Sequence, residues 1–290
     1  MPTIRTNDIE TNYVRRGTGP PIVFIHAMIM TTEMWEPQMD TLDDAFTTIA
    51  YDVRGHGRTG GSDRNPYSIE LFASDLNALL NALDIDRAVV CGLSMGGTIA
   101  QAFAAAHPQR VAGLVLADTF PSGPLPLTGR IALANIRFLA RLDRFINYKT
   151  LNRWQLRVGN LLLPGVSGDK VTIQRIVDES PTIPHTEFVK IADATARFPL
   201  ANIDLSQVTA PTLILHGEHL PTANEETTER LVGQLSNSNP TVHMVPGSGH
   251  ASNLDNPAFF TARLREFLTS PVYGDGNENI SDRSDAGDSS

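Results

Sequence analysis

A serine between two glycines is the feature of the sequence that most directly suggests chemistry. Residues 88–97 read Ala-Val-Val-Cys-Gly-Leu-Ser-Met-Gly-Gly, so Ser94 follows a short apolar run and precedes an alanine-rich stretch at 98–107. The apolar run predicts a buried strand, and the alanine-rich stretch predicts a helix. A sharp strand-to-helix turn needs glycines, because the two backbones approach too closely there for side chains. The pattern therefore predicts a nucleophilic serine whose hydroxyl stands clear of the sheet.

A serine hydroxyl attacks well only when a base takes its proton and an acid orients that base. For a serine on such a turn, the acid and then the histidine follow later in the chain. His250 suits the role of base, because it follows the last expected strand in the glycine-rich run 247–250. His56 lies in a glycine loop, His107 ends a helix and His243 falls within a strand, so we expect structural or surface roles for these three.

The elements around these residues predict an α/β fold. Strands are expected at 21–26, 45–52, 87–91 and 111–117, with a helix at 68–83 and an opening hairpin over 3–15. Continuous apolar strands that alternate with helices are typical of a doubly wound, mostly parallel sheet.

The alternation stops in the middle of the chain and then resumes. Residues 121–205 are mostly helical with prolines in the loops, and the strand pattern returns at 210–217. We expect a core formed by 1–120 and 206–270. A helical lid over 121–205 would be inserted after the strand that follows the nucleophile strand, at the sheet edge where such folds bind ligands. The tail at 271–290 is rich in Asp, Asn, Ser and Gly, which predicts an acidic, disordered segment.

Composition excludes several classes of protein. The 290 residues carry a formal net charge of −9 without a basic block, which argues against nucleic-acid binding. Cys91 is the only cysteine, so no internal disulfide can form and a reducing compartment is expected. No apolar run is long enough to cross a membrane, and the first residues lack the apolar core of a signal peptide. We therefore expect a cytoplasmic protein without a nucleic-acid or membrane partner.

Four pieces of the sequence, in this order, resemble the α/β-hydrolase superfamily. They are His26-Ala-Met with Trp35 downstream, the run from Asp52 to Gly57, the run around Ser94, and Gly247-x-Gly-His250. The likeness covers 22–117 and 211–268. The Ser94 run, with His107-Pro-x-Arg-Val after it, is most similar to the serine esterase, enol-lactonase and cofactor-free haloperoxidase branches.

This resemblance implies the α/β-hydrolase fold and a carboxylesterase- or lactonase-like enzyme. The enzyme would cleave a small carboxylic ester, thioester or lactone through an acyl-enzyme on Ser94, with His250 as general base. No motif requires a metal or an organic cofactor. Two alternatives stay open: a cofactor-free haloperoxidase or perhydrolase activity, and a non-catalytic hydrolase relative that binds a small molecule.

The acid is the point at which the sequence departs from the family pattern. The family usually has Gly-x-x-Asp after the strand that ends near 215, but here Gly217-Glu-His is followed by Leu220. Asp118, at the end of the strand after the nucleophile strand, is the first choice, because some family members carry their acid there. Glu218 is the alternative, and a site without an acid is a third reading.

The resemblance also implies an oxyanion hole and a pocket. The backbone N–H groups of Met28 and Met95 would bind the oxyanion. We expect the substrate pocket to include His26, Ala27, Trp35 and Leu93, and Met28 and Met30 to line the acyl site or to pack in the core. The run from Asp52 to Gly57 is expected to be structural.

Overall fold

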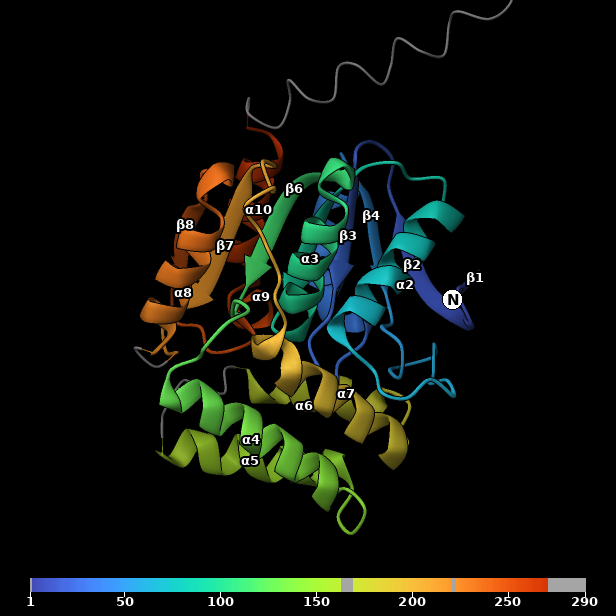
Figure 1. The fold of residues 1–290 in the computed structure, drawn as a ribbon, viewed down its shortest axis with the longest axis vertical. Coiled ribbons are helices and arrows are strands. Elements are labelled where there is room, and N and C mark those ends of the chain that lie inside the picture. Colours follow the sequence, from blue (N-terminus) through green and yellow to red (C-terminus); the bar gives the residue numbers. More distant parts are fainter. Residues whose placement is uncertain (1, 163–168, 221–222, 271–290) are drawn as a thin grey trace, which may run out of the picture.

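An eight-stranded sheet organises the protein (Figure 1). The computed structural model describes residues 2–162, 169–220 and 223–270. The strands are β1 (Thr3–Thr6), β2 (Ile9–Arg16), β3 (Pro21–Ile25), β4 (Thr47–Tyr51), β5 (Ala88–Leu93), β6 (Val111–Ala117), β7 (Thr212–Gly217) and β8 (Thr241–Val245). Their order in the sheet is β1-β2-β4-β3-β5-β6-β7-β8. The β1–β2 and β2–β4 pairs are antiparallel and every other pair is parallel, which confirms the predicted doubly wound, mostly parallel sheet.

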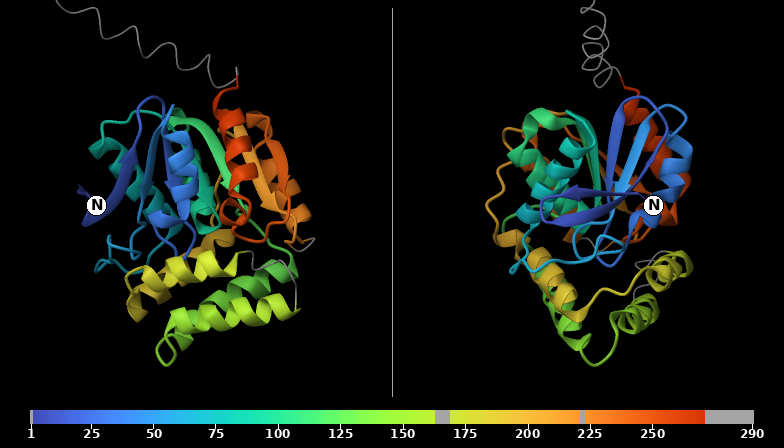
Figure 2. Two further views of the ribbon diagram at one scale, coloured as in Figure 1. Left: turned by 180° about the vertical axis from the view of Figure 1, so that it is seen from behind. Right: turned by 90° about the vertical axis from the view of Figure 1, so that its right-hand side faces the viewer.

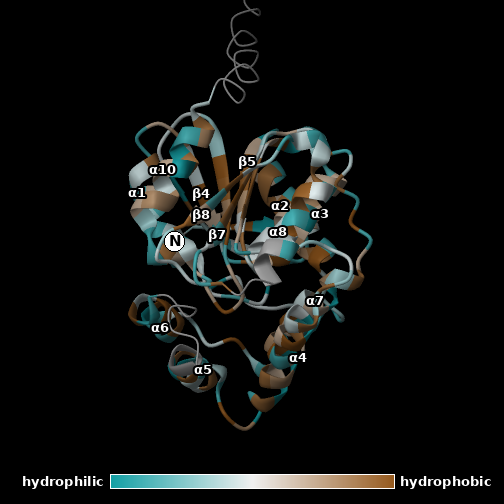
Figure 3. Ribbon diagram, turned by 90° about the vertical axis from the view of Figure 1, so that its left-hand side faces the viewer, coloured by the Kyte–Doolittle hydropathy of each residue, from teal (hydrophilic) through white to brown (hydrophobic). Residues whose placement is uncertain are grey.

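Helices cover both faces of this sheet, and for this reason its central strands are buried on both sides. Figure 3 shows α1 (Glu36–Leu42) and α10 (Pro257–Leu268) on one side, and α2 (Ile69–Ala82), α3 (Met95–Ala106) and α8 (Ala223–Gln234) on the other. Every residue of β4 and β5 is buried, so neither strand could carry an alternating polar face. The remaining short helices of the core are η1 (Thr32–Trp35), η2 (Pro108–Arg110), η3 (Phe198–Leu200), η4 (Ser236–Ser238) and α9 (Ser252–Asp255).

Four helices between β6 and β7 form a separate layer across one end of the sheet (Figures 1 and 2). They are α4 (Leu127–Leu142), α5 (Tyr148–Leu162), α6 (Lys170–Glu179) and α7 (His185–Arg197), and we call them the helical layer. In Figure 1, α6 and α7 lie nearer the sheet, and α4 and α5 lie farther from it. The layer covers the carboxyl ends of the parallel strands, the edge at which residues following β5 and β6 emerge.

The element boundaries differ from the sequence prediction in one instructive place. Helix α3 begins at Met95, directly after Ser94, whereas the sequence pattern suggested a start near residue 98. Gly96 and Gly97 belong to the helix even though glycine weakens a helix in isolation. A Cβ on Gly96 would lie 2.1 Å from the carbonyl oxygen of Ile25, so only glycine allows the helix to pack this closely on β3. The predicted disordered tail lies outside the described residues.

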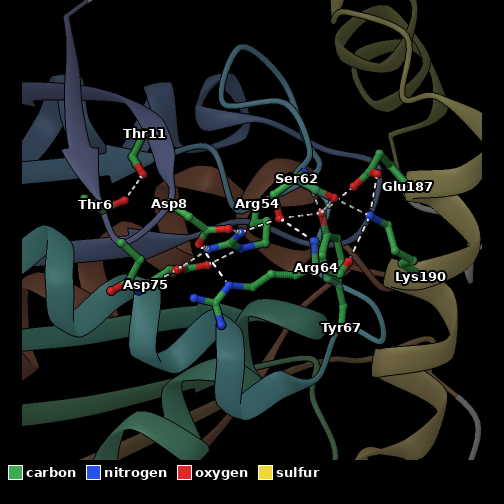
Figure 4. A network of polar contacts seen from close by, with 11 residues as sticks. Thr6, Asp8, Thr11, Arg54, Ser62, Arg64, Tyr67, Asp75, Glu187 and Lys190 are labelled. Atoms are coloured by element: carbon green, nitrogen blue, oxygen red, sulfur yellow. Dashed lines mark hydrogen bonds and ion pairs between the residues drawn. The ribbon is translucent and has the colours of Figure 1, made fainter.

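Polar contacts fix one side of the helical layer to the core (Figure 4). Lys190, on α7, donates from Nζ to the carbonyl oxygen of Ser62 at 2.7 Å and forms an ion pair with Glu187 at 2.6 Å. The Tyr67 hydroxyl donates to the same Glu187 carboxylate, and the Lys190 ammonium lies 4.1 Å from the centre of the Tyr67 ring. Both charged side chains are largely buried, so helix α7 is attached to the loop between β4 and α2 by a shielded network.

Candidate active site

Ser94 lies at the junction of β5 and α3 in a backbone conformation that side chains rarely adopt. Its torsion angles are φ 56° and ψ −116°. The turn is held by hydrogen bonds from the Ser94 N–H to the carbonyl of Ala117 at 2.9 Å and from the Thr98 N–H to the carbonyl of Ser94 at 3.1 Å. A Cβ on Gly92 would lie 2.2 Å from the carbonyl oxygen of Gly96, which explains the glycine two residues before the serine. The hydroxyl is therefore held at the N-terminus of α3, where the helix dipole favours negative charge.

His250 is placed against this serine by the loop that follows β8. Its Nε2 atom lies 2.9 Å from Ser94 Oγ, within hydrogen-bond distance although 156 residues separate the two. Desolvation beside the cavity lowers the pKa of His250 below its usual value of 6.5, although part of the residue stays exposed to solvent. The ring is therefore neutral at neutral pH and, with its proton on Nδ1, accepts the serine proton at Nε2.

Two carboxylates hold the turn that carries His250. Glu218 accepts a hydrogen bond from the N–H of Gly247 at 2.8 Å, and Asp255 accepts one from the N–H of Gly249 at 2.7 Å. Glu218 thus contacts the backbone of the turn rather than the imidazole. The position of the ring depends on these supports, because a glycine-rich turn has little conformational preference of its own.

Asp118 is buried directly behind the same loop. One carboxylate oxygen accepts the N–H of Gly217 at 2.9 Å and the other accepts the N–H of Ser252, two residues beyond His250, at 3.0 Å. Burial raises the pKa of this carboxyl to about 7, against the hydrogen bonds that favour its ionised form. Among the residues that the structure describes, no carboxylate hydrogen-bonds to the His250 ring, so Asp118 is joined to the histidine through the backbone at Ser252.

The backbone N–H groups of Met28 and Met95 are free to bind a ligand. Met95 is the first residue of α3, where a helix leaves its N–H groups without a partner inside the helix. Neither N–H donates a hydrogen bond to another residue within the described part of the chain. Next to Met28, Ile29 has a positive φ of 63°, so this loop also holds an uncommon backbone conformation beside the serine.

A cavity of about 310 Å³ opens above Ser94 and His250. From the core it is lined by Ala27, Met28, Leu93 and Met95. The helical layer supplies the opposite wall, which consists of Ile136, Leu139, Tyr148, Leu151, Asn152, Gln155, Leu156, Ile173, Phe188 and Thr195. The wall is mostly apolar, so the cavity suits the hydrocarbon part of a small molecule.

Comparison with known proteins agrees with this geometry. The family model described as alpha/beta hydrolase fold matches residues 20–257, which include the strand-to-helix turn at Ser94 and the loop of His250. The chain belongs to the α/β-hydrolase family. The sheet order and the helices on both faces described above are those of this fold.

Several α/β-hydrolases of known name are similar to this one. The 3-oxoadipate enol-lactonase 2 of Acinetobacter baylyi is 34% identical over 119 residues, 40% of this chain and 44% of that protein. A non-heme chloroperoxidase of Streptomyces lividans is 37% identical over 127 residues, 42% of this chain and 45% of that protein. These matches span less than half of either relative. The structure of a thermophilic esterase from Thermogutta terrifontis superposes with a TM-score of 0.76 at 27% identity, covering 92% of this chain and 97% of that one.

Two residues expected in the pocket of this α/β-hydrolase lie elsewhere. Trp35 is fully buried and stacks on Phe24, with 4.9 Å between the ring centres. His26 is also fully buried; its Nε2 accepts the N–H of Val53 at 2.9 Å and its Nδ1 donates to the carbonyl of Ala27 at 2.8 Å. Neither residue is among those that line the cavity. The expectation that they line the pocket is therefore corrected.

The run from Asp52 to Gly57 has the structural role expected of it in the sequence. Asp52 accepts hydrogen bonds from the N–H groups of Thr32 and Arg58 and from the Asn12 side chain. Arg54 is fully buried and donates to Asp75 and Asp8, at the other end of the network in Figure 4. None of these side chains lines the cavity.

Sequence reasoning did not identify the residues that the helical layer places on the cavity wall. Tyr148, Phe188 and Asn152 come from three separate turns of α5 and α7, and no motif links them to Ser94. The only available signal was helical periodicity, and periodicity does not distinguish a face that packs on the core from one that borders a cavity. In the described part of the chain, no group of three or more His, Cys, Asp or Glu side chains could hold a metal ion, and no helix is long and apolar enough to span a membrane.

Proposed function

We propose that this α/β-hydrolase cleaves a small carboxylic ester, thioester or lactone through an acyl-enzyme on Ser94. The observation that carries the proposal is the 2.9 Å contact between Ser94 Oγ and His250 Nε2 at the floor of an apolar cavity. A neutral imidazole beside a serine at a helix N-terminus has the protonation state and the position that a general base requires. The names of two relatives, an enol-lactonase and an esterase, indicate the same class of bond.

The reaction begins when His250 takes the Ser94 proton and Oγ attacks the carbonyl carbon. The carbonyl oxygen becomes an oxyanion, which the N–H groups of Met28 and Met95 stabilise as the charge develops. The tetrahedral intermediate collapses, the protonated His250 gives its proton to the leaving oxygen or sulfur, and an acyl ester remains on Ser94. His250 then activates a water molecule that releases the acid product and restores the serine.

Asp118 is the carboxylate that we assign as the acid partner of His250. It is buried behind the histidine loop and its two oxygens fix that loop at Ser252 and the end of β7 at Gly217. When this carboxyl is ionised, its buried negative charge favours the imidazolium form that His250 adopts during the reaction. Glu218 contacts only the backbone of the outer turn, so we assign it a supporting role. We also assign α4–α7 the role of the lid whose inner side selects the acyl group.

A second candidate is perhydrolysis, because one relative is named a non-heme chloroperoxidase. In that reaction hydrogen peroxide replaces water at the acyl-enzyme and a peracid leaves, which then oxidises a halide to hypohalous acid. The two activities share Ser94 and His250. They are separated by measuring halogenation in acetate and peroxide against turnover of an aryl ester.

A fluorophosphonate probe followed by mass spectrometry tests the proposal. We expect an adduct on Ser94 in the unaltered protein and none in Ser94→Ala. His250→Ala should slow labelling by about a thousandfold, within the usual range for loss of a general base. Asp118→Asn should slow it strongly, and Glu218→Gln, a matched carboxylate-to-amide change in the same loop cluster, should slow it much less. Absence of an adduct on the folded protein would contradict ester hydrolysis and favour the alternative of a non-catalytic hydrolase relative that binds a small molecule.

A further inference from the structure

The outer side of the helical layer exposes an unusual set of large apolar side chains. They are Leu127, Ile131 and Phe138 on α4, Phe145 in the turn between α4 and α5, and Trp154 and Val158 on α5. Each is more than half exposed, and Phe145 is 80% exposed. Together they make up most of the exposed large apolar residues of the described chain. We call this set the outer face.

On α4, helical spacing turns the outer-face side chains away from the cavity. Leu127, Ile131 and Phe138 are four and seven residues apart, so they form one stripe along α4. The cavity-lining Ile136 and Leu139 are turned from Phe138 by about 160° and 100°, at roughly 100° per residue. Figures 1 and 2 show α4 and α5 on the side of the layer that is remote from the sheet. None of the outer-face residues lines the cavity, so the outer face is distinct from the substrate site.

Positive charge is concentrated on the same two helices. Seven of the 23 lysine and arginine residues lie within 127–158, together with one acidic residue, Asp143, in a chain whose net charge is −9. Some of these cations are paired with other helices of the layer: Arg137 and Arg141 with Asp193, and Arg153 with Asp178. Other cations, Arg130, Arg144 and Arg157, are exposed and form no ion pair with any described residue.

We propose that the outer face docks on an anionic phospholipid surface. Apolar and aromatic side chains flanked by arginines on paired helices are what an amphipathic segment needs to lie in a membrane interface. The apolar stripe would enter the headgroup boundary, and each nearby cation would gain from the negative surface potential. A second copy of the chain is a poor fit, because a symmetric contact through this face would set arginines opposite arginines.

This docking would hold the outer side of the helical layer at the lipid surface while the acidic core faces water. It differs from the sequence-based expectation of no membrane partner, since it involves an interface helix rather than a spanning segment. The proposal does not depend on ester hydrolysis, because every residue of the outer face lies outside the machinery of Ser94 and His250.

Tryptophan fluorescence with lipid vesicles tests the docking. The chain has two tryptophans: Trp35 is fully buried in the core and Trp154 is 53% exposed on the outer face. With vesicles that contain phosphatidylglycerol, we expect the emission of Trp154 to shift to shorter wavelength and its quenching by acrylamide to fall. Vesicles of phosphatidylcholine alone should give a much smaller change, and high salt should weaken binding to the anionic vesicles.

Substitutions distinguish docking through the outer face from non-specific adsorption of the protein to lipid. Arg144→Glu combined with Arg157→Glu should weaken vesicle binding by about 30-fold or more, because each cation near an anionic surface contributes substantially. Phe145→Ser should weaken it through loss of apolar insertion. Val242→Ser with Met244→Ser, which removes exposed apolar groups from the edge strand β8, is the matched control and should not change binding. The thermal midpoint of each variant checks that it is folded.

Three results would overturn the proposal. The first is failure of the unaltered protein to sediment with anionic vesicles at low salt. The second is binding that the two arginine substitutions leave unchanged. The third is a concentration-dependent dimer, seen by analytical ultracentrifugation and lost in Phe138→Ser, since the outer face would then be occupied by a second copy. Fluorophosphonate labelling of Ser94 is measured in parallel, so failure of docking and failure of hydrolysis give different results.

Discussion

At the scale of single residues, uncommon backbone conformations gather around the reaction centre. Ser94, Asp118 and Ile29 all have positive φ angles, which cost free energy for residues other than glycine. The surrounding packing supports them: Gly92 and Gly96 let β5, α3 and β3 approach, and backbone hydrogen bonds hold the turn. The hydroxyl of Ser94 is therefore positioned before substrate arrives, and no reorganisation is needed during attack.

Two buried histidines lead to a prediction about acid stability. Burial lowers the pKa of His26 to about 4 and of His56 to about 3, both from 6.5, and their ring centres are 4.9 Å apart. The unfolded chain takes up protons on both rings below about pH 6.5, whereas the folded protein does not. The contribution of these two rings to the free energy of unfolding should therefore be full above pH 6.5 and should fall toward pH 4 by about 1.4 kcal/mol per pH unit for each ring.

Urea unfolding at pH 7, 6 and 5 measures this slope. The Nε2 atom of His56 is buried and has no hydrogen-bond partner among the described residues, so His56→Gln removes one titrating group without breaking a bond at that atom. This variant should show a shallower loss of stability toward acid. An identical pH dependence of stability in His56→Gln and the unaltered protein would show that the His56 ring is not held neutral.

At the scale of elements, the contact between α7 and the loop after β4 explains how the helical layer is oriented. Gly61 leaves room for the Glu187 carboxylate, because a Cβ at this position would lie 2.1 Å from the carboxylate carbon. Lys190 donates from Nζ to the carbonyls of Ser62 and Arg64 in the same loop. Helix α4 packs against α7, so this one attachment also positions the cavity residues on α4.

Removing Glu187 tests this attachment. In Glu187→Ala, Lys190 remains largely buried without its ionic partner and the Tyr67 hydroxyl keeps only the longer hydrogen bond to the Ser62 carbonyl, so the free energy of unfolding should fall by about 3 kcal/mol. Glu179→Ala removes one partner of the exposed Arg175–Glu179 pair and should cost less than about 1 kcal/mol. Urea unfolding measures the loss of free energy of unfolding in both variants. Similar losses would show that burial of the Glu187–Lys190 pair does not increase its contribution to stability.

At the scale of the whole molecule, the site is the meeting point of four distant segments. Ser94 follows β5, Asp118 follows β6, His250 follows β8, and the helical layer closes the cavity. Asp255 connects the last two: one carboxylate oxygen accepts the N–H of Gly249 at 2.7 Å, and the other accepts the N–H of Asp169, at the start of α6, at 2.6 Å. One side chain thus joins the histidine turn to the helical layer.

Asp255→Asn tests this connection. An amide offers only one acceptor oxygen, so one of the two backbone N–H groups must lose its partner. We expect the rate of Ser94 labelling to fall by about tenfold or more through misplacement of the His250 ring. Asp204→Asn changes another aspartate that accepts a backbone N–H, from Ser206, in a loop away from the site, and should leave labelling unchanged. Equal rates in Asp255→Asn and the unaltered protein would mean that the turn keeps its place without this link.

Much of this architecture could be predicted from the sequence, because the informative signals are local. Periodicity and glycine spacing indicated the parallel strands and the strand-to-helix turn, since a buried strand must be apolar and a tight turn must lack side chains. Ser94 and His250 stood out for the same reason: each follows a predicted strand in a glycine-rich segment, and parallel strands end at one edge of the sheet. The family resemblance rested on these segments, and the family model covers them.

Tertiary packing alone decided which side chains meet. Trp35 and His26 follow the family motif, yet both side chains are fully buried and neither lines the cavity. The carboxylate contacts around His250 could not be predicted from the sequence either. Asp118 accepts hydrogen bonds from N–H groups 99 and 134 residues away, and the residues next to Asp118 in the sequence give no indication of those partners. The sequence indicated the outer face only through helical periodicity. Periodicity identifies an apolar stripe on a helix, whereas the tertiary structure determines whether other elements cover that stripe. Local sequence determines conformation, whereas burial and long-range contacts arise only when the chain closes on itself.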